Sequence, residues 1–70
     1  MADVKEEILR ILREREEVYT KELAKILSKS PTTVSKYLVI LEAEGRVKRR
    51  VQKPYTYWSI KNKNEGEQNG

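Results

Sequence analysis

The sequence predicts an α+β fold that is mainly α, with three helices followed by a two-stranded β-hairpin within residues 1–61. Apolar residues recur with helical spacing in three stretches. Ser30-Pro31 and Gly45 are typical of helix ends, and residues 46–60 are rich in β-branched and aromatic side chains. The 70 residues make one domain, near the lower size limit for folding on an apolar core alone.

The first helix is predicted over residues 3–16. Asp3 can cap it, and Glu6 stands three residues later, as in a capping box. Leu9 lies at the edge of the apolar stripe, so it faces either the core or another subunit. The stripe itself consists of residues at 3.6-residue spacing: Val4, Ile8, Ile11 and Leu12.

A short extended segment and a second helix are predicted next. Val18 and Tyr19 favour β-structure and can pair with the later hairpin. Thr20 is expected to cap the second helix and to leave its hydroxyl near the helix N-terminus. The narrow apolar side of this helix is formed by Leu23, Ala24 and Leu27.

The third helix follows after a tight turn. Ser30 is expected to cap it, Pro31 takes the first helical position, and the helix runs to about Glu44 before Gly45 ends it. At 100° per residue, its buried side consists of Val34, Leu38 and Leu41. The opposite side presents Thr32, Thr33 and Lys36, with Tyr37 at the border. Two short helices joined in this way predict a helix-turn-helix.

The hairpin is predicted to have strands at about 46–51 and 55–60, with Pro54 limiting the pairing between them. Its core side is expected to contain Val47, Val51, Trp58 and Ile60. One strand and its tip carry five basic residues and no acid: Arg46, Lys48, Arg49, Arg50 and Lys53. Residues 62–70 are polar without apolar periodicity, which predicts a disordered tail.

Basic residues are concentrated in the middle of the chain. Residues 1–19 contain four basic and six acidic groups, residues 20–63 contain eleven and three, and residues 64–70 contain two acidic groups. This segregation predicts one positive face that meets a polyanion. A lysine-rich surface of the kind found in heat-adapted proteins is the alternative explanation.

The composition also excludes several kinds of site. The chain has no cysteine and no histidine, so thiolate and imidazole metal sites and the commonest general base are absent. No Gly-rich phosphate loop or catalytic constellation can be assembled, so we predict that the protein is not an enzyme and needs no cofactor. No apolar run approaches the roughly 18 residues of a membrane span, which predicts a soluble, cytoplasmic protein. The positive face expected to meet a polyanion predicts that it is nucleoid-associated.

Three helices and a hairpin, with the second and third helices forming a helix-turn-helix, make a winged helix. Over about residues 5–61 the chain resembles the DNA-binding domain of bacterial and archaeal ArsR-type and MarR-type transcription regulators. The resemblance implies a regulator that binds double-stranded DNA. It is carried by Glu22, Leu23, Ala24, Leu27, Ser30, Thr33, Val34, Ser35, Lys36, Leu38, Leu41, Glu42, Gly45, Val47, Arg50, Tyr57, Trp58, Ser59 and Ile60.

The resemblance also implies which part of the third helix contacts DNA. In such domains the N-terminal half of this helix enters the major groove, which assigns bases and nearby phosphates to Thr32, Thr33, Ser35 and Lys36. Hydroxyls near helix N-termini, here Thr20 and Ser30, are implied to bind phosphate. Thr and Ser side chains suit either base edges or phosphates, and lysine suits guanine acceptors. Because this face has no Arg, Asn or Gln, specificity is modest or depends on DNA shape.

The wing is implied to contact the adjacent backbone or the minor groove. Its cations would supply the salt-dependent part of the affinity, with Arg50 and Lys53 ranked first and Arg49 next. Strand alternation places Lys48 and Arg50 on one face and Arg49 on the other. Tyr55 can stack on a base or donate to phosphate, but aromatic pairing across the hairpin is an equal alternative.

Three points of the resemblance stay open. No small-molecule effector is expected, because so small a core leaves little room for a pocket. A homodimer is expected through Leu9, Val39 and Ile40, each of which also fits the edge of the core. The main alternative function is a winged-helix protein-interaction module within a larger complex, against which the acid-free hairpin strand argues.

A left-handed DNA reader is a further alternative. Winged helices of that kind have a proline-containing wing with a tryptophan nearby, to which Pro54 and Trp58 are similar. Their recognition helix carries a lysine, an asparagine and a tyrosine where this chain has Pro31, Ser35 and Val39. The three replacements argue against this alternative.

Overall fold

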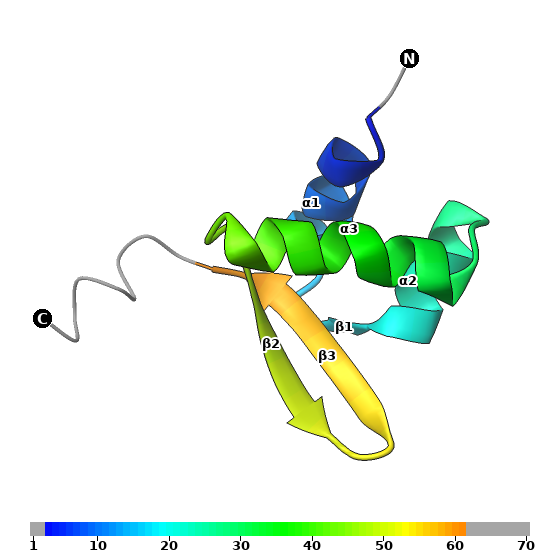
Figure 1. Cartoon of the computed structure of the whole chain (residues 1–70), viewed down its shortest axis with the longest axis vertical. Helices are drawn as coiled ribbons and strands as arrows, with labels where there is room; N and C mark the ends of the chain where they lie inside the picture. Colours follow the sequence, from blue (N-terminus) through cyan, green and yellow to red (C-terminus); the bar gives the residue numbers. More distant parts are fainter. Residues whose placement is uncertain (1–2, 62–70) are drawn as a thin grey trace, which may run out of the picture.

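The computed structural model describes residues 3–61, which form three helices and a three-stranded antiparallel sheet (Figure 1). This confirms the predicted fold class. The predicted tail, residues 62–70, lies outside the described residues. In chain order the elements are α1 (Val4–Glu14), β1 (Val18–Tyr19), α2 (Thr20–Leu27), α3 (Pro31–Ala43), β2 (Val47–Gln52) and β3 (Tyr55–Ile60).

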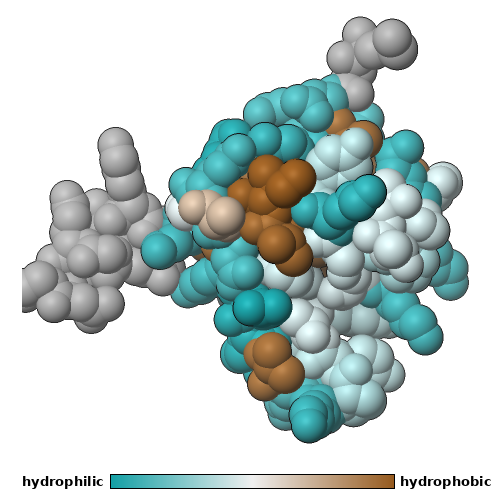
Figure 2. Space-filling view, in the orientation of Figure 1, coloured by the Kyte–Doolittle hydropathy of each residue, from teal (hydrophilic) through white to brown (hydrophobic). Residues whose placement is uncertain are grey.

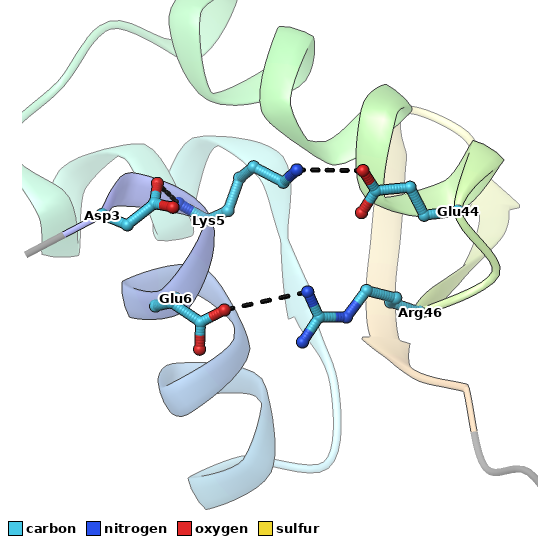
Figure 3. Close-up of polar contacts among 5 residues, drawn as sticks. All are labelled: Asp3, Lys5, Glu6, Glu44 and Arg46. Atoms are coloured by element: carbon cyan, nitrogen blue, oxygen red, sulfur yellow. Dashed lines mark hydrogen bonds and ion pairs between the residues drawn. The ribbon is translucent and has the colours of Figure 1, made fainter.

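The N-terminal cap of α1 is the predicted one, but the capping box is not formed. The Asp3 carboxylate accepts the backbone N–H of Lys5 at 3.1 Å. The carboxylate of Glu6 lies instead 3.7 Å from the guanidinium of Arg46, at the start of the hairpin (Figure 3). Beside it, the Lys5 ammonium donates to Glu44 at 3.0 Å. Both pairs link α1 to the C-terminal end of α3 and the segment after it.

The ends of α3 follow the signals in the sequence. The Ser30 hydroxyl oxygen accepts the backbone N–H of Thr33 at 3.2 Å, and Pro31 occupies the first turn. Ser28 ends α2 in the left-handed conformation, with φ of 57°. Gly45 follows α3 with φ of 78°, a backbone conformation that glycine adopts without a steric penalty. The predicted turn and the predicted glycine stop are therefore confirmed.

The core draws apolar side chains from all three helices and from the sheet. Leu9 is only 2% exposed, so it belongs to the core and cannot form part of a dimer interface. Its burial has a physical reason: α1 packs against both α3 and β3, which widens its buried stripe. The buried residues are Ile8, Leu9, Ile11, Leu12, Val18, Leu23, Ala24, Val34, Leu38, Leu41, Val47 and Trp58.

The sheet has the strand order β1-β3-β2. Val18 pairs with Trp58, which confirms that the short extended segment joins the hairpin. The β2–β3 hairpin, called the wing below, projects away from the helices (Figure 1). Val47 is buried at the base of the wing, but Val51 is 60% exposed, so its predicted core position is wrong. Val51 lies on the same face of β2 as Val47, as expected, but it is too far along the wing for the helices to cover it.

Candidate nucleic-acid interface

The orientation of α3 is fixed by three side chains on its core side that are 0% exposed: Val34, Leu38 and Leu41. Burial on one side of the helix leaves the opposite side facing solvent. Among the residues predicted to contact DNA, Thr32, Thr33 and Lys36 are exposed there and Ser35 is half-buried. The structure thus brings these four predicted residues together on one helix.

The hydroxyl groups at the start of α3 bond to one another. Besides accepting the N–H of Thr33, the Ser30 hydroxyl donates to the Thr33 hydroxyl at 2.9 Å. Both residues are exposed. Ser30 therefore caps the helix, and its hydroxyl lies beside that of Thr33 at the exposed N-terminus of α3.

Thr20 does not cap α2 as predicted, and its phosphate contact stays a prediction. It is the first residue of α2 and not its cap, and Tyr19 stands at the cap position without a side-chain bond. The Thr20 hydroxyl accepts the indole N–H of Trp58 at 2.8 Å and donates to the carbonyl of Thr56 at 3.4 Å. Its hydroxyl thus links α2 to the wing. This hydrogen bond could not be predicted from local sequence patterns, because 38 residues separate its partners.

The wing presents its basic residues on two faces, as predicted. Arg49 lies opposite Trp58 and shares the face that packs on the helices, whereas Arg50 lies opposite Tyr57 on the other face. Lys48, opposite Ser59, shares the face of Arg50. A single phosphate cannot meet all three cations at once.

Arg49 bridges the wing and α3. Its guanidinium lies 5.7 Å from the ring centroid of Trp58, and its Nε atom is 3.4 Å from a carboxylate oxygen of Glu42. Glu42 is on α3 and Arg49 is on β2. The pair therefore connects the two elements that are predicted to contact DNA.

Arg50 is held by the carboxylate of Glu17, which was not among the residues predicted to form the site. Its Nη2 and Nε atoms donate to the two oxygens of Glu17 at 2.8 and 2.9 Å, and its guanidinium lies 4.6 Å from the ring centroid of Tyr57. Arg50 also donates to Gln52. The hydrogen bonds from Arg50 lower the pKa of Glu17 below its usual value, and the bonds to Glu17 raise the pKa of Arg50. The one sequence signal for this pair is position, since Glu17 directly precedes β1 and Tyr19 of β1 lies opposite Tyr57, the strand partner of Arg50.

The tip of the wing carries Lys53, which is exposed and has no ion-pair partner among residues 3–61. Tyr55 follows it and is 44% exposed. The ring of Tyr55 lies 4.9 Å from that of Tyr19 and 6.1 Å from that of Tyr57, measured between centroids. The aromatic cluster that was the alternative for Tyr55 is thus present, with part of the ring still facing solvent.

Two kinds of feature are absent from residues 3–61. Within residues 3–61, no group of three acidic side chains lies close enough together to hold a metal ion. In the same range, no helix is long and apolar enough to cross a membrane.

Solved structures share this fold. HlyU from Vibrio cholerae, in its reduced form, has a TM-score of 0.81 at 21% identity, over 96% of this chain and 70% of that one. The Zalpha domain of Carassius auratus PKZ, solved in complex with Z-DNA, has a TM-score of 0.75 at 23% identity, over 81% and 90% of the two chains. At such identities the likeness concerns the fold alone.

Lactococcus lactis ZitR, solved as a C30S mutant in complex with DNA, is 26% identical with a TM-score of 0.79. The match covers 90% of this chain and 44% of the ZitR chain. No curated protein sequence matches the chain significantly. The model of the family described as "Bacterial regulatory protein, arsR family" matches residues 4–49, from the start of α1 into β2. The chain therefore belongs to the arsR family of bacterial regulatory proteins and has the fold of a winged-helix DNA-binding transcription regulator.

Proposed function

We propose that the protein binds double-stranded DNA selectively, with the N-terminal half of α3 in the major groove and the wing on the backbone or the minor groove. The observation that carries this proposal is the exposed face of Thr32, Thr33 and Lys36 on a helix locked by burial on its other side. Short hydroxyls and a lysine are able to contact base edges and phosphates.

The charge distribution supports the same proposal. Between residues 31 and 60 the only acids are Glu42 and Glu44. Glu42 is paired with Arg49, and Glu44 is paired with Lys5. In the free protein cations therefore hold both carboxylates, and this part of the chain carries a positive net charge toward an approaching phosphate.

Among the wing cations, we propose Lys53 as the first phosphate contact, because it lies at the tip without a competing carboxylate among residues 3–61. Arg49 and Arg50 are proposed to contact phosphate by exchanging Glu42 and Glu17 for it. A phosphate accepts the same forked hydrogen bonds as a carboxylate, so the exchange keeps the geometry of the guanidinium. Tyr55 is proposed to contact the backbone from the edge of the aromatic cluster.

A salt titration of binding to duplex DNA tests the proposal. Each phosphate that the protein neutralises contributes about −0.9 to the slope of log K against log salt concentration. We expect a steep slope from the α3 and wing cations together. A protein that fails to bind duplex DNA even at low salt would contradict the proposal and favour the protein-interaction module.

A further inference from the structure

The C-terminal half of α3 exposes aliphatic side chains that the domain itself does not cover. Val39 is 52% exposed and Ile40 is 43% exposed. Ala43, one turn further on, is also exposed. Figure 2 shows an apolar patch at the middle of the face formed by α3, with hydrophilic side chains around it. Neither the core nor the proposed lysine and hydroxyl contacts account for these residues.

The aliphatic side chains continue the line of the residues proposed to meet the bases. At 100° per residue, Lys36, Val39 and Ala43 all lie within about 40° of the direction opposite Val34. Ile40 lies about 60° from the same direction. DNA that contacts Lys36 along the axis of α3 would therefore meet Val39 next, about one helical turn along.

A protein partner fits this patch less well than DNA does. A stable protein interface takes roughly 20–30 residues from each side, with apolar side chains at its centre. The third residue expected in a dimer interface, Leu9, is buried in the core, so the expected apolar set does not form one surface. The patch on α3 instead adjoins Lys36, since Val39 and Ile40 follow it by three and four residues on the helix.

The major groove offers one apolar group that matches such side chains. Each thymine presents its C5-methyl group there, whereas the other base edges present hydrogen-bond donors and acceptors. Val39, Ile40 and Ala43 have no polar side-chain atom, so they can read a methyl group but cannot bond to an acceptor. We infer that the contact with the major groove extends past the N-terminal half of α3, so that Val39 and Ile40 bind thymine methyl groups there and select DNA. This inference rests on the proposed function.

The test compares two duplexes that differ only in this methyl group. The first is a duplex of A·T pairs in mixed order, and the second has deoxyuridine in place of every thymidine. Affinities for both are measured by fluorescence anisotropy at low salt. We expect the wild-type protein to prefer the thymine duplex by about fourfold for each methyl group it buries, which corresponds to about 0.8 kcal/mol.

Two variants locate the contact. Val39→Ala and Ile40→Ala should each reduce the preference for thymine over deoxyuridine toward one. Alanine is the best helix former and both positions are exposed, so α3 should stay folded. The matched control is Ile26→Ala on α2, because Ile26 is 41% exposed against 43% for Ile40. This control should keep the wild-type preference.

The outcomes separate the inference from the proposed function. Equal binding of both duplexes by the wild-type protein would overturn the inference alone, and so would an equal loss on both duplexes in Val39→Ala. Absence of binding to either duplex would overturn the proposed function as well. Sedimentation of the free protein covers the remaining alternative. A dimer that Val39→Ala dissociates would assign the patch to a second copy of the chain and would also overturn the inference.

Discussion

The two elements proposed to contact DNA are held in place by different forces. Three side chains of α3 are 0% exposed and fix the helix by burial. In β2 only Val47 is buried, and the rest of the strand is exposed. The middle of the wing is held by the pairs of Arg49 with Glu42 and of Arg50 with Glu17.

This difference predicts different responses to solution conditions. Burial of apolar surface is not weakened by physiological salt, whereas ion pairs at the surface are screened and contribute little stability. The position of α3 should therefore persist across salt concentrations, and the wing should respond to salt and to anions. The predictions that follow test this contrast, beginning with the largest expected effect.

Leu38→Ala tests the anchor of α3. Removing a fully buried leucine side chain should lower the free energy of unfolding by about 3 kcal/mol, within a range of about 2–5. A small domain has only about 5–15 kcal/mol in total, so this loss is a large share of its stability. Urea denaturation followed by circular dichroism measures the loss, with Val39→Ala as the exposed control. A loss below about 1 kcal/mol would contradict anchoring by burial.

Thr20→Val tests the link between α2 and the wing. The variant keeps the shape of the side chain but leaves the indole N–H of Trp58, a residue only 2% exposed, without its acceptor. The expected loss is about 1–3 kcal/mol of unfolding free energy. Trp58 is the chain's single tryptophan, so its fluorescence during denaturation reports on this site. Thr20→Ser keeps the hydroxyl and should retain most of the stability, and an equal loss in both variants would point to packing instead of the hydrogen bond.

Lys53→Gln tests the proposed phosphate contact at the wing tip. The magnitude of the slope of log K against log salt concentration should fall by about 0.9, and binding to all sequences should weaken alike. Lys36→Gln on α3 is the contrasting variant, because it should also change the base preference. An unchanged slope in Lys53→Gln would make the tip of the wing structural.

Glu17→Gln tests the pair on the outer face of the wing and should have the smallest effect. Arg50 lowers the pKa of Glu17 in the folded state below its usual value of 4.5. The pair therefore stabilises the fold fully above that value, and this stabilisation is lost as the pH falls through the lower folded-state pKa. The difference in unfolding free energy between wild type and Glu17→Gln should be constant near neutral pH and should vanish in acid. A difference that is independent of pH would contradict the role of this pair.

The sequence predicted those features that depend on neighbouring residues. Ser30, Pro31 and Gly45 determine the ends of α3 through local backbone chemistry, so its bounds were predicted to within a residue. The alternation of Lys48 and Arg50 with Arg49 likewise follows from the geometry of any strand.

Features that depend on how far an element extends over its neighbours were not predicted. Leu9 is buried because two elements cover α1, and Val51 is exposed because the wing extends beyond the helices. Thr20 and Glu17 bond to the wing across more than 30 residues of chain. Four of the side chains predicted to contact DNA lie together on α3, but which residues touch bases stays a prediction.

The strand order has a consequence for association between copies of the protein. Because β3 lies in the centre of the sheet, β2 is an edge strand, and among residues 3–61 one side of its backbone has no partner strand. Such an edge can pair with a strand of another molecule, and positive side chains along it oppose this. Three consecutive cations, Lys48, Arg49 and Arg50, lie on this strand. The residues proposed to attract DNA thus also protect the fold from edge-to-edge aggregation, so neutralising all three should reduce solubility together with affinity.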